Sequence, residues 1–218
     1  MVATNTAAVT YCRRVLDAAI TGFLTGLSLI VAIGAQNAYV LRQGILRSHI
    51  GAVVALCAVS DLVLIVAGVS GVGAVVGHAG VMLDVVRWFG VAFLLWYAAG
   101  SLRRARSGEA LFAADGSAST ESRGTVLGRA AALTWLNPHV YLDTVLLVGS
   151  IAATHDNVSG GRWWFALGAG LASIVWFNGL GFGATRLAPL LSRPRAWQWV
   201  EVVLAATMIL VAVRLAFG

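Results

Sequence analysis

Charge is scarce in this chain. Only 11% of its 218 residues are charged, and lysine is absent, because all 15 basic residues are arginine. A soluble domain usually carries about 25% charged residues. Hydrophobic residues make up 59% of the sequence, with a mean hydropathy of +0.86. So few polar residues cannot cover a water-facing surface, which excludes an ordinary soluble domain and favours a membrane protein.

Several motifs of enzymes and binding proteins are also missing. The two cysteines belong to no CxxC or Cys/His cluster, so neither a metal site nor a cofactor is expected. The glycine-rich run 179–183 follows no strand, and no Walker loop is present, which argues against nucleotide binding. No nucleophile–base arrangement indicates an enzyme. The arginines lie between apolar runs without interleaved aromatics, so nucleic-acid binding is not expected.

Long apolar runs dominate what is present. A membrane-crossing helix needs about 20 apolar residues, and runs of this kind recur along the chain. They are rich in alanine, leucine and glycine and lack the alternation of barrel strands. The sequence therefore predicts an all-α membrane protein with six transmembrane helices. The expected segments are Asp17–Leu41, Ile50–Val69, Val85–Leu102, Arg129–Ala152, Trp163–Phe182 and Trp197–Phe217.

A polar connection at 103–128 divides the single transmembrane domain into halves of about 17–102 and 129–217. Near the end of the first segment, Asn37-Ala38-Tyr39-Val40 matches Asn137-Pro138-His139-Val140 in the fourth, with asparagine and valine at the same offset. Three spans in each half would invert the second copy. We therefore expect two inverted three-helix repeats, a common plan of transporters. Most arginines lie in the odd-numbered connections, which predicts that 103–128 is cytoplasmic.

An acidic side chain occurs near the middle of the second segment, at Asp61. An aspartate at a helix centre costs about 2.5–3.5 kcal/mol on insertion scales. Such a group usually marks a proton or substrate path, although a neutral or paired aspartate could merely tie helices together. We favour a function for Asp61. In the other half, Asn178 follows Phe177 where Asp61 follows Ser60, and it joins the predicted pathway.

The fourth segment carries the sequence Asn137-Pro138-His139-Val140-Tyr141-Leu142-Asp143. Pro138 removes a backbone donor and frees a carbonyl, which membrane helices tolerate where neighbours or water restore the bond. His139 and Asp143 lie four residues apart and share a helix face. Asn137, the freed backbone and Asp143 are expected to form a polar pocket. The alternative is a segment near the interface with His139 simply solvated.

Two amides close the first apolar core, Gln36 and Asn37. Their donors and acceptors could hold an α-carboxylate or an α-amino group, and Gly34 would allow a close approach. A helix end that merely approaches a polar loop explains the same residues equally well. The spacing leaves both interpretations open.

Together, Ile33-Gly34-Ala35-Gln36-Asn37-Ala38, Arg42-Gln43-Gly44, Ser60-Asp61 and Leu136–Thr144 resemble the lysine/arginine exporters of the LysE/ArgO type. The resemblance covers nearly the whole chain, in order. It implies a multi-pass protein of the bacterial inner membrane that exports amino acids, commonly L-lysine and L-arginine, driven by the proton motive force. The family's functional positions then fall on Gln36, Asn37, Asp61, Asn137, Pro138 and Asp143.

The implied partners are an amino-acid substrate, protons and membrane lipid, with a homo-oligomer left open. Two intramembrane carboxylates suit a cationic substrate and an exchanged proton. Alternatives are an exporter of neutral amino acids or other small metabolites, and a channel or membrane scaffold that transports nothing itself.

Overall fold

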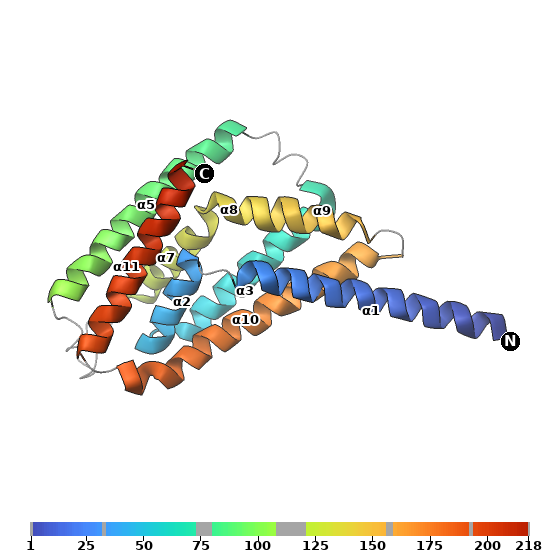
Figure 1. Cartoon of the computed structure of the whole chain (residues 1–218), viewed down its shortest axis with the longest axis horizontal. Helices are drawn as coiled ribbons and strands as arrows, with labels where there is room; N and C mark the ends of the chain where they lie inside the picture. The colour runs from blue at the N-terminus through green and yellow to red at the C-terminus, as the bar shows by residue number, and fades with distance from the viewer. Residues whose placement is uncertain are drawn as a thin grey trace. The chain divides into compact units, whose positions relative to one another are not determined.

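The computed structural model describes residues 2–31, 34–72, 80–107, 121–155, 159–191 and 194–217. Within these ranges every regular element is a helix, which confirms the all-α prediction (Figure 1). The elements are α1 (Val2–Ile30), α2 (Ala35–Leu46), α3 (Ile50–Ala67), η1 (Gly68–Val72), α5 (Gly80–Ser107), α7 (Arg123–Trp135), α8 (Pro138–Val140), η2 (Tyr141–Leu147), α9 (Val148–Ala153), α10 (Gly161–Leu191) and α11 (Pro194–Phe217).

Four of the six expected segments coincide with helices, in α3 with η1, α5, α10 and α11. The prediction of an unbroken first segment is wrong, because α1 ends at Ile30 and a new helix begins at Ala35. Its N-cap, Gly34, has an extended backbone with φ −111° and ψ 172°. The fourth segment is also interrupted, since α7 ends at Trp135 and the next helix begins at Pro138. Proline disfavours the helical conformation of the residue before it.

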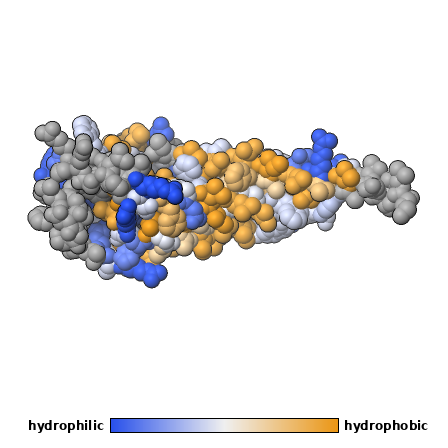
Figure 2. Space-filling view, turned by 90° about the horizontal axis from the view of Figure 1, so that it is seen from below, coloured by the Kyte–Doolittle hydropathy of each residue, from blue (hydrophilic) through white to orange (hydrophobic). Residues whose placement is uncertain are grey.

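Three helices in the described ranges are long and apolar enough to cross a membrane, over Ile50–Gly71, Gly161–Arg186 and Gln198–Phe217. A fourth is added if Val9–Ile30 and Ala35–Leu46 form one interrupted span. Many apolar side chains on these helices stay exposed, and hydrophobic residues (orange) cover much of the face shown in Figure 2. Such a surface suits hydrocarbon rather than water.

The chain forms two compact units, each assembled from separate stretches of sequence. Unit 1 comprises Met1–Ala32, Ala58–Gly80 and His139–Trp176, and unit 2 comprises Ile33–Cys57, Val81–Pro138 and Phe177–Gly218. The predicted polar connection is partly helical at its ends, because α5 continues to Ser107 and α7 begins at Arg123, while 108–120 lie outside the described residues.

Unit 1 contains a close contact between α1 and α10 that small residues permit. A Cβ added at Gly168 would lie 1.9 Å from the backbone oxygen of Ala19, and one at Gly22 would lie 2.0 Å from that of Phe165. Small residues allow membrane helices to approach in this way. Around this contact, the buried core of unit 1 consists of Ile65, Val69, Val148, Ala152, Phe165, Ala166 and Ala169.

We expect Gly168→Ala to lower the melting temperature in detergent, because the added methyl group meets backbone atoms of α1 that cannot yield without moving the helix. Overpacking of this kind costs about 1–3 kcal/mol. Gly179 is a matched control on the same helix, since nothing lies within 4 Å of a Cβ placed there. Gly179→Ala should leave the melting temperature unchanged or slightly raised. Equal effects of the two substitutions would contradict the close contact.

In unit 2, α5 and α11 lie side by side (Figure 1) and run antiparallel. Arg87, near the start of α5, donates to the backbone oxygens of Leu215 and Ala216 at the end of α11. Arg104, near the end of α5, reaches Glu201 near the start of α11. Arginine at a helix C-terminus binds carbonyls that have no partner within the helix. Helix α2 packs against α7 and α11.

Candidate functional site

Asp61 lies on α3 within unit 1 and is only 8% exposed. The Ser173 hydroxyl on α10 donates a hydrogen bond to its Oδ2 at 2.9 Å. In the part of the chain that the structure describes, no arginine forms an ion pair with this carboxylate. A buried carboxylate without a cation is costly, which keeps such groups rare outside functional positions.

Asp143 stands in a different environment, on the wide turn η2. Its backbone oxygen accepts a hydrogen bond from the Val148 amide, five residues later, in place of the usual four. Such π-helical turns are often found at functional sites. The side chains of Asp143 and His139 are both exposed and lie four residues apart. Of the two predicted pathway acids in unit 1, Asp61 is thus buried and Asp143 is accessible.

The two predicted amides Gln36 and Asn37 lie in unit 2, in the first turn of α2. The prediction that they lie at the end of the first helix is wrong, because they begin a new one. Gly34 provides no side-chain cap there. The buried Nε2 atom of Gln36 has no hydrogen-bond partner among the described residues. The first turn of α2 therefore offers donors at the positive end of a helix dipole.

The two helix interruptions, before Ala35 and before Pro138, lie close together within unit 2. Residues next to both of them line one small cavity of about 10 Å³. Its lining includes Ala35, at the start of α2, and Asn137, just before α8. The remaining lining residues are Gly90, Phe93, Leu94, Ala132, Leu133, Leu136 and Val211. A space of this size holds about one water molecule and is too small for an amino acid.

The eight predicted residues fall into two sets. Unit 1 holds Asp61, His139 and Asp143, and unit 2 holds the rest: Gln36, Asn37, Asn137, Pro138 and Asn178. Pro138 is buried, whereas Asn178 is exposed on α10. Within unit 2 the structure brings Asn137 to the start of α2. Within unit 1 the described hydrogen bond of Asp61 goes to Ser173 and not to His139 or Asp143.

A buried ionic cluster in unit 2 was not predicted from the sequence. Glu201 is fully buried and accepts hydrogen bonds from Arg42 Nε at 2.9 Å and from Arg104 Nη2 at 3.2 Å. Arg42, which follows the first expected segment, lies within α2 and is only 5% exposed. The negative charge of the Glu201 carboxylate compensates for the burial of the Arg42 guanidinium group. Glu201 is the only acid in the segment Trp197–Phe217, and this lone acid in an apolar run is the sequence feature that could have indicated the cluster.

Tyrosine rings lie beside this cluster. Tyr97 packs edge-on against Tyr39, with ring centroids 5.7 Å apart. The guanidinium groups of Arg104 and Arg129 lie 5.6 Å and 6.0 Å from the centre of the Tyr97 ring. The Tyr39 hydroxyl donates to the backbone oxygen of Val126 on α7. Together with the ion pairs of Glu201, these contacts link α2, α5, α7 and α11.

We expect Glu201→Leu to destabilise the protein by about 3 kcal/mol, because it leaves two arginines without their carboxylate and one of them is deeply buried. Thermal unfolding in detergent micelles measures this. Glu121→Gln is the matched control, since it removes the partly exposed pair of Glu121 with Arg129, which is worth less than about 1 kcal/mol. Adding Arg42→Met to Glu201→Leu should restore part of the lost stability. Equal effects at Glu201 and Glu121 would refute a tightly coupled cluster.

The helices and the ionisable groups inside them define a multi-pass α-helical membrane protein with carboxylates placed within apolar segments. Residues 27–218 match the family described as LysE type translocator. The chain belongs to this family, a class of transport proteins and not of enzymes, and the predicted family is confirmed.

The chain is similar to three proteins named lysine exporter LysE. It is 39% identical to the one from Corynebacterium diphtheriae, over 92% of this chain and 99% of that protein. It is 39% identical to the one from Corynebacterium efficiens, over 90% and 96%. It is 37% identical to the one from Corynebacterium glutamicum, over 90% and 97%. No solved structure matches the chain.

Proposed function

We propose that this protein is a secondary transporter that exports basic amino acids, L-lysine and L-arginine, across the bacterial inner membrane, driven by the proton motive force. The observation that carries the proposal is Asp61, a buried carboxylate on an apolar helix with a hydroxyl as its hydrogen-bond partner. Relatives named lysine exporters support the substrate class. The absence of a Walker loop from the sequence favours a gradient over ATP as the energy source.

The proposed topology is six spans in two inverted halves. The first half of the chain contributes α1 and the later part of α3 to unit 1, and the second half contributes η2, α9 and the earlier part of α10. Unit 2 contains the complementary pieces of the same four segments, together with α5 and α11. If each segment of the first half is replaced by its counterpart in the second half, and the reverse, the pieces found in unit 1 become the complementary pieces found in unit 2. A repeat in the same orientation would place corresponding pieces, such as α1 and α7, in one unit.

The interruptions support the same topology. Segment one breaks before Ala35 and segment four before Pro138, close to the matched Asn37 and Asn137. Interrupted helices at corresponding positions of two halves are a recurring sign of transporter binding sites. Cytoplasmic placement of the connection 103–128 remains our proposal, from the arginine count.

The predicted residues carry groups that suit an amino-acid substrate. In unit 2, the first turn of α2 with Gln36 and Asn37 can donate hydrogen bonds to an α-carboxylate, helped by the helix dipole. Asn137 and Asn178 add further amide groups to the proposed pathway. In unit 1, the accessible Asp143 can pair with a cationic side chain, beside His139. The buried Asp61 is the proposed proton carrier.

The test is transport in proteoliposomes that contain only the pure protein. Vesicles loaded with unlabelled lysine should accumulate labelled lysine or arginine by counterflow, saturably, and an imposed pH gradient should drive net flux. Counterflow of leucine but not lysine would move the assignment to neutral amino acids. Flux that does not saturate with substrate concentration would indicate a channel. The absence of flux for every tested amino acid would refute a carrier.

A further inference from the structure

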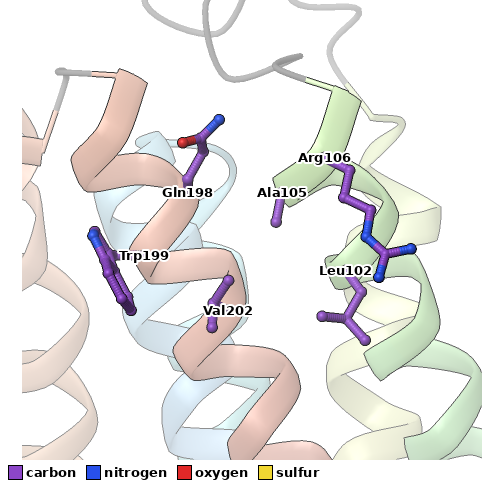
Figure 3. A pocket seen from close by; sticks show the side chains of 6 residues that line it. All are labelled: Leu102, Ala105, Arg106, Gln198, Trp199 and Val202. Atoms are coloured by element: carbon purple, nitrogen blue, oxygen red, sulfur yellow. The ribbon is translucent and has the colours of Figure 1, made fainter.

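A groove on unit 2 lies between the last turns of α5 and the first turns of α11 (Figure 3). It has a volume of about 530 Å³, within the range of ligand pockets. Leu102, Ala105 and Val202 lie between the two helices, with Arg106 beside them on α5 and Trp199 on the other flank of α11. Gln198 completes the lining.

From this arrangement, we propose that the groove binds an anionic phospholipid, with the phosphate at Arg106 and an acyl chain along Leu102 and Val202. This inference goes beyond the proposed transport function and does not depend on which substrate is carried. It rests on the position, the charge and the apolar walls of the groove.

We infer the depth of the groove, at the boundary between hydrocarbon and water, from the ends of its two helices. The apolar span of α11 begins at Gln198, and α5 ends one residue after Arg106. Trp199 is 68% exposed, as is typical of tryptophans that sit at the headgroup level. A phosphate held here would be at its normal depth, with its acyl chains pointing into the bilayer.

The charges favour an anion. Arg104 forms an ion pair with Glu201, whereas the side chains of Arg103 and Arg106 are exposed. Neither forms an ion pair with an acid in the described part of the chain. Basic residues near a membrane surface attract anionic lipids, and basic pockets between helices hold their headgroups.

The walls favour a lipid over a soluble anion. A free phosphate would leave Leu102, Ala105 and Val202 uncovered in a groove that opens beside other exposed apolar side chains of α11, such as Val203. An acyl chain covers this surface. A phospholipid therefore satisfies both the guanidinium group and the apolar lining.

Native mass spectrometry of the full chain in mild detergent tests the proposal, with phosphatidylglycerol and phosphatidylethanolamine as probes. We expect phosphatidylglycerol to bind more tightly, and Arg106→Gln to weaken it about fivefold. Arg103→Gln is the matched control, because Arg103 is exposed on the same helix but does not line the groove. It should change binding less than twofold.

A second variant tests the acyl chain. Val202→Phe fills part of the groove from a position that is 37% exposed, so folding should survive, and it should weaken binding of phosphatidylglycerol with the charge intact. Inorganic phosphate at millimolar concentration should not displace the lipid. Equal binding of the two lipids, equal losses for Arg103→Gln and Arg106→Gln, or displacement by free phosphate would each overturn the proposal. Lysine counterflow is measured separately, so failure here would leave the transport proposal unaffected.

Discussion

Replacing Asp61 with asparagine is expected to abolish amino-acid efflux driven by a pH gradient, down to the level of liposomes without protein. Asparagine has nearly the same shape as aspartate, and its oxygen can still accept the hydrogen bond from Ser173. It cannot bind and release a proton. Exchange of labelled for unlabelled substrate requires no net proton movement and should persist in part.

This result would separate two roles that geometry alone allows for Asp61. If the carboxylate only ties α3 to α10, asparagine preserves the tie and coupled flux continues. If it carries the proton, coupling disappears while the fold stays intact, because a charge near the middle of an apolar helix is removed and not added. Coupled flux in Asp61→Asn at half the native rate or more would reject the proton role.

Ser173→Ala is the companion variant. This substitution removes the Ser173 hydroxyl but keeps the Asp61 carboxylate to which the hydroxyl donates a hydrogen bond. We expect coupled flux to persist at a reduced rate, since a single neutral donor is worth about 1 kcal/mol. A complete loss in Ser173→Ala with little change in Asp61→Asn would identify the serine as the essential group. Melting temperatures of both variants in detergent show whether either effect arises from unfolding.

The positions of most helices could be predicted from the sequence, because long apolar runs leave the backbone no alternative in hydrocarbon. Four expected segments coincide with α3, α5, α10 and α11, with ends that differ by at most nine residues. Asp61 was recognisable for the same reason, since an acid in such a run is conspicuous. The interruption at Pro138 was also predictable, because proline acts locally.

Features set by tertiary contacts were not predictable. The end of α1 at Ile30 falls inside an apolar run, and composition there does not distinguish a break from a continuous helix. The hydrogen bond from the Val148 amide to the Asp143 backbone oxygen spans five residues, and no pattern of side chains in the sequence predicts it. The partnership of Arg42 with Glu201 joins residues 159 positions apart, so arginine counting assigned Arg42 to a connection.

The two predicted pathway acids of unit 1 differ in a way that bears on the substrate. Asp61 is buried and bonded to a hydroxyl, whereas Asp143 is exposed on a widened turn. An accessible carboxylate can remain charged and receive a cation directly from water, and a buried one suits reversible protonation. Placing two carboxylates in unlike environments allows them to perform different tasks. We therefore expect Asp143 to select for a cationic substrate.

Cells that express the protein should tolerate the arginine analogue canavanine, or lysine-containing dipeptides, and should hold less internal lysine and arginine than cells without it. Asp143→Asn should reach the membrane and lose this protection. A charge pair made by an exposed carboxylate is worth up to about 1 kcal/mol, so its loss lowers the apparent affinity for the cation roughly fivefold. In proteoliposomes the loss should appear as a raised KM for lysine.

Asp17→Asn serves as the control, because Asp17 is an exposed acid on α1, also in unit 1, and belongs to no predicted pathway. It should leave both tolerance and KM unchanged. If Asp143→Asn behaves like Asp17→Asn, the cation is recognised elsewhere. If cells with the native protein keep normal lysine and arginine but resist a toxic neutral amino acid, the substrate is neutral. Charge in the pathway would then be balanced by protons alone, leaving Asp61 as the group that the transport cycle requires.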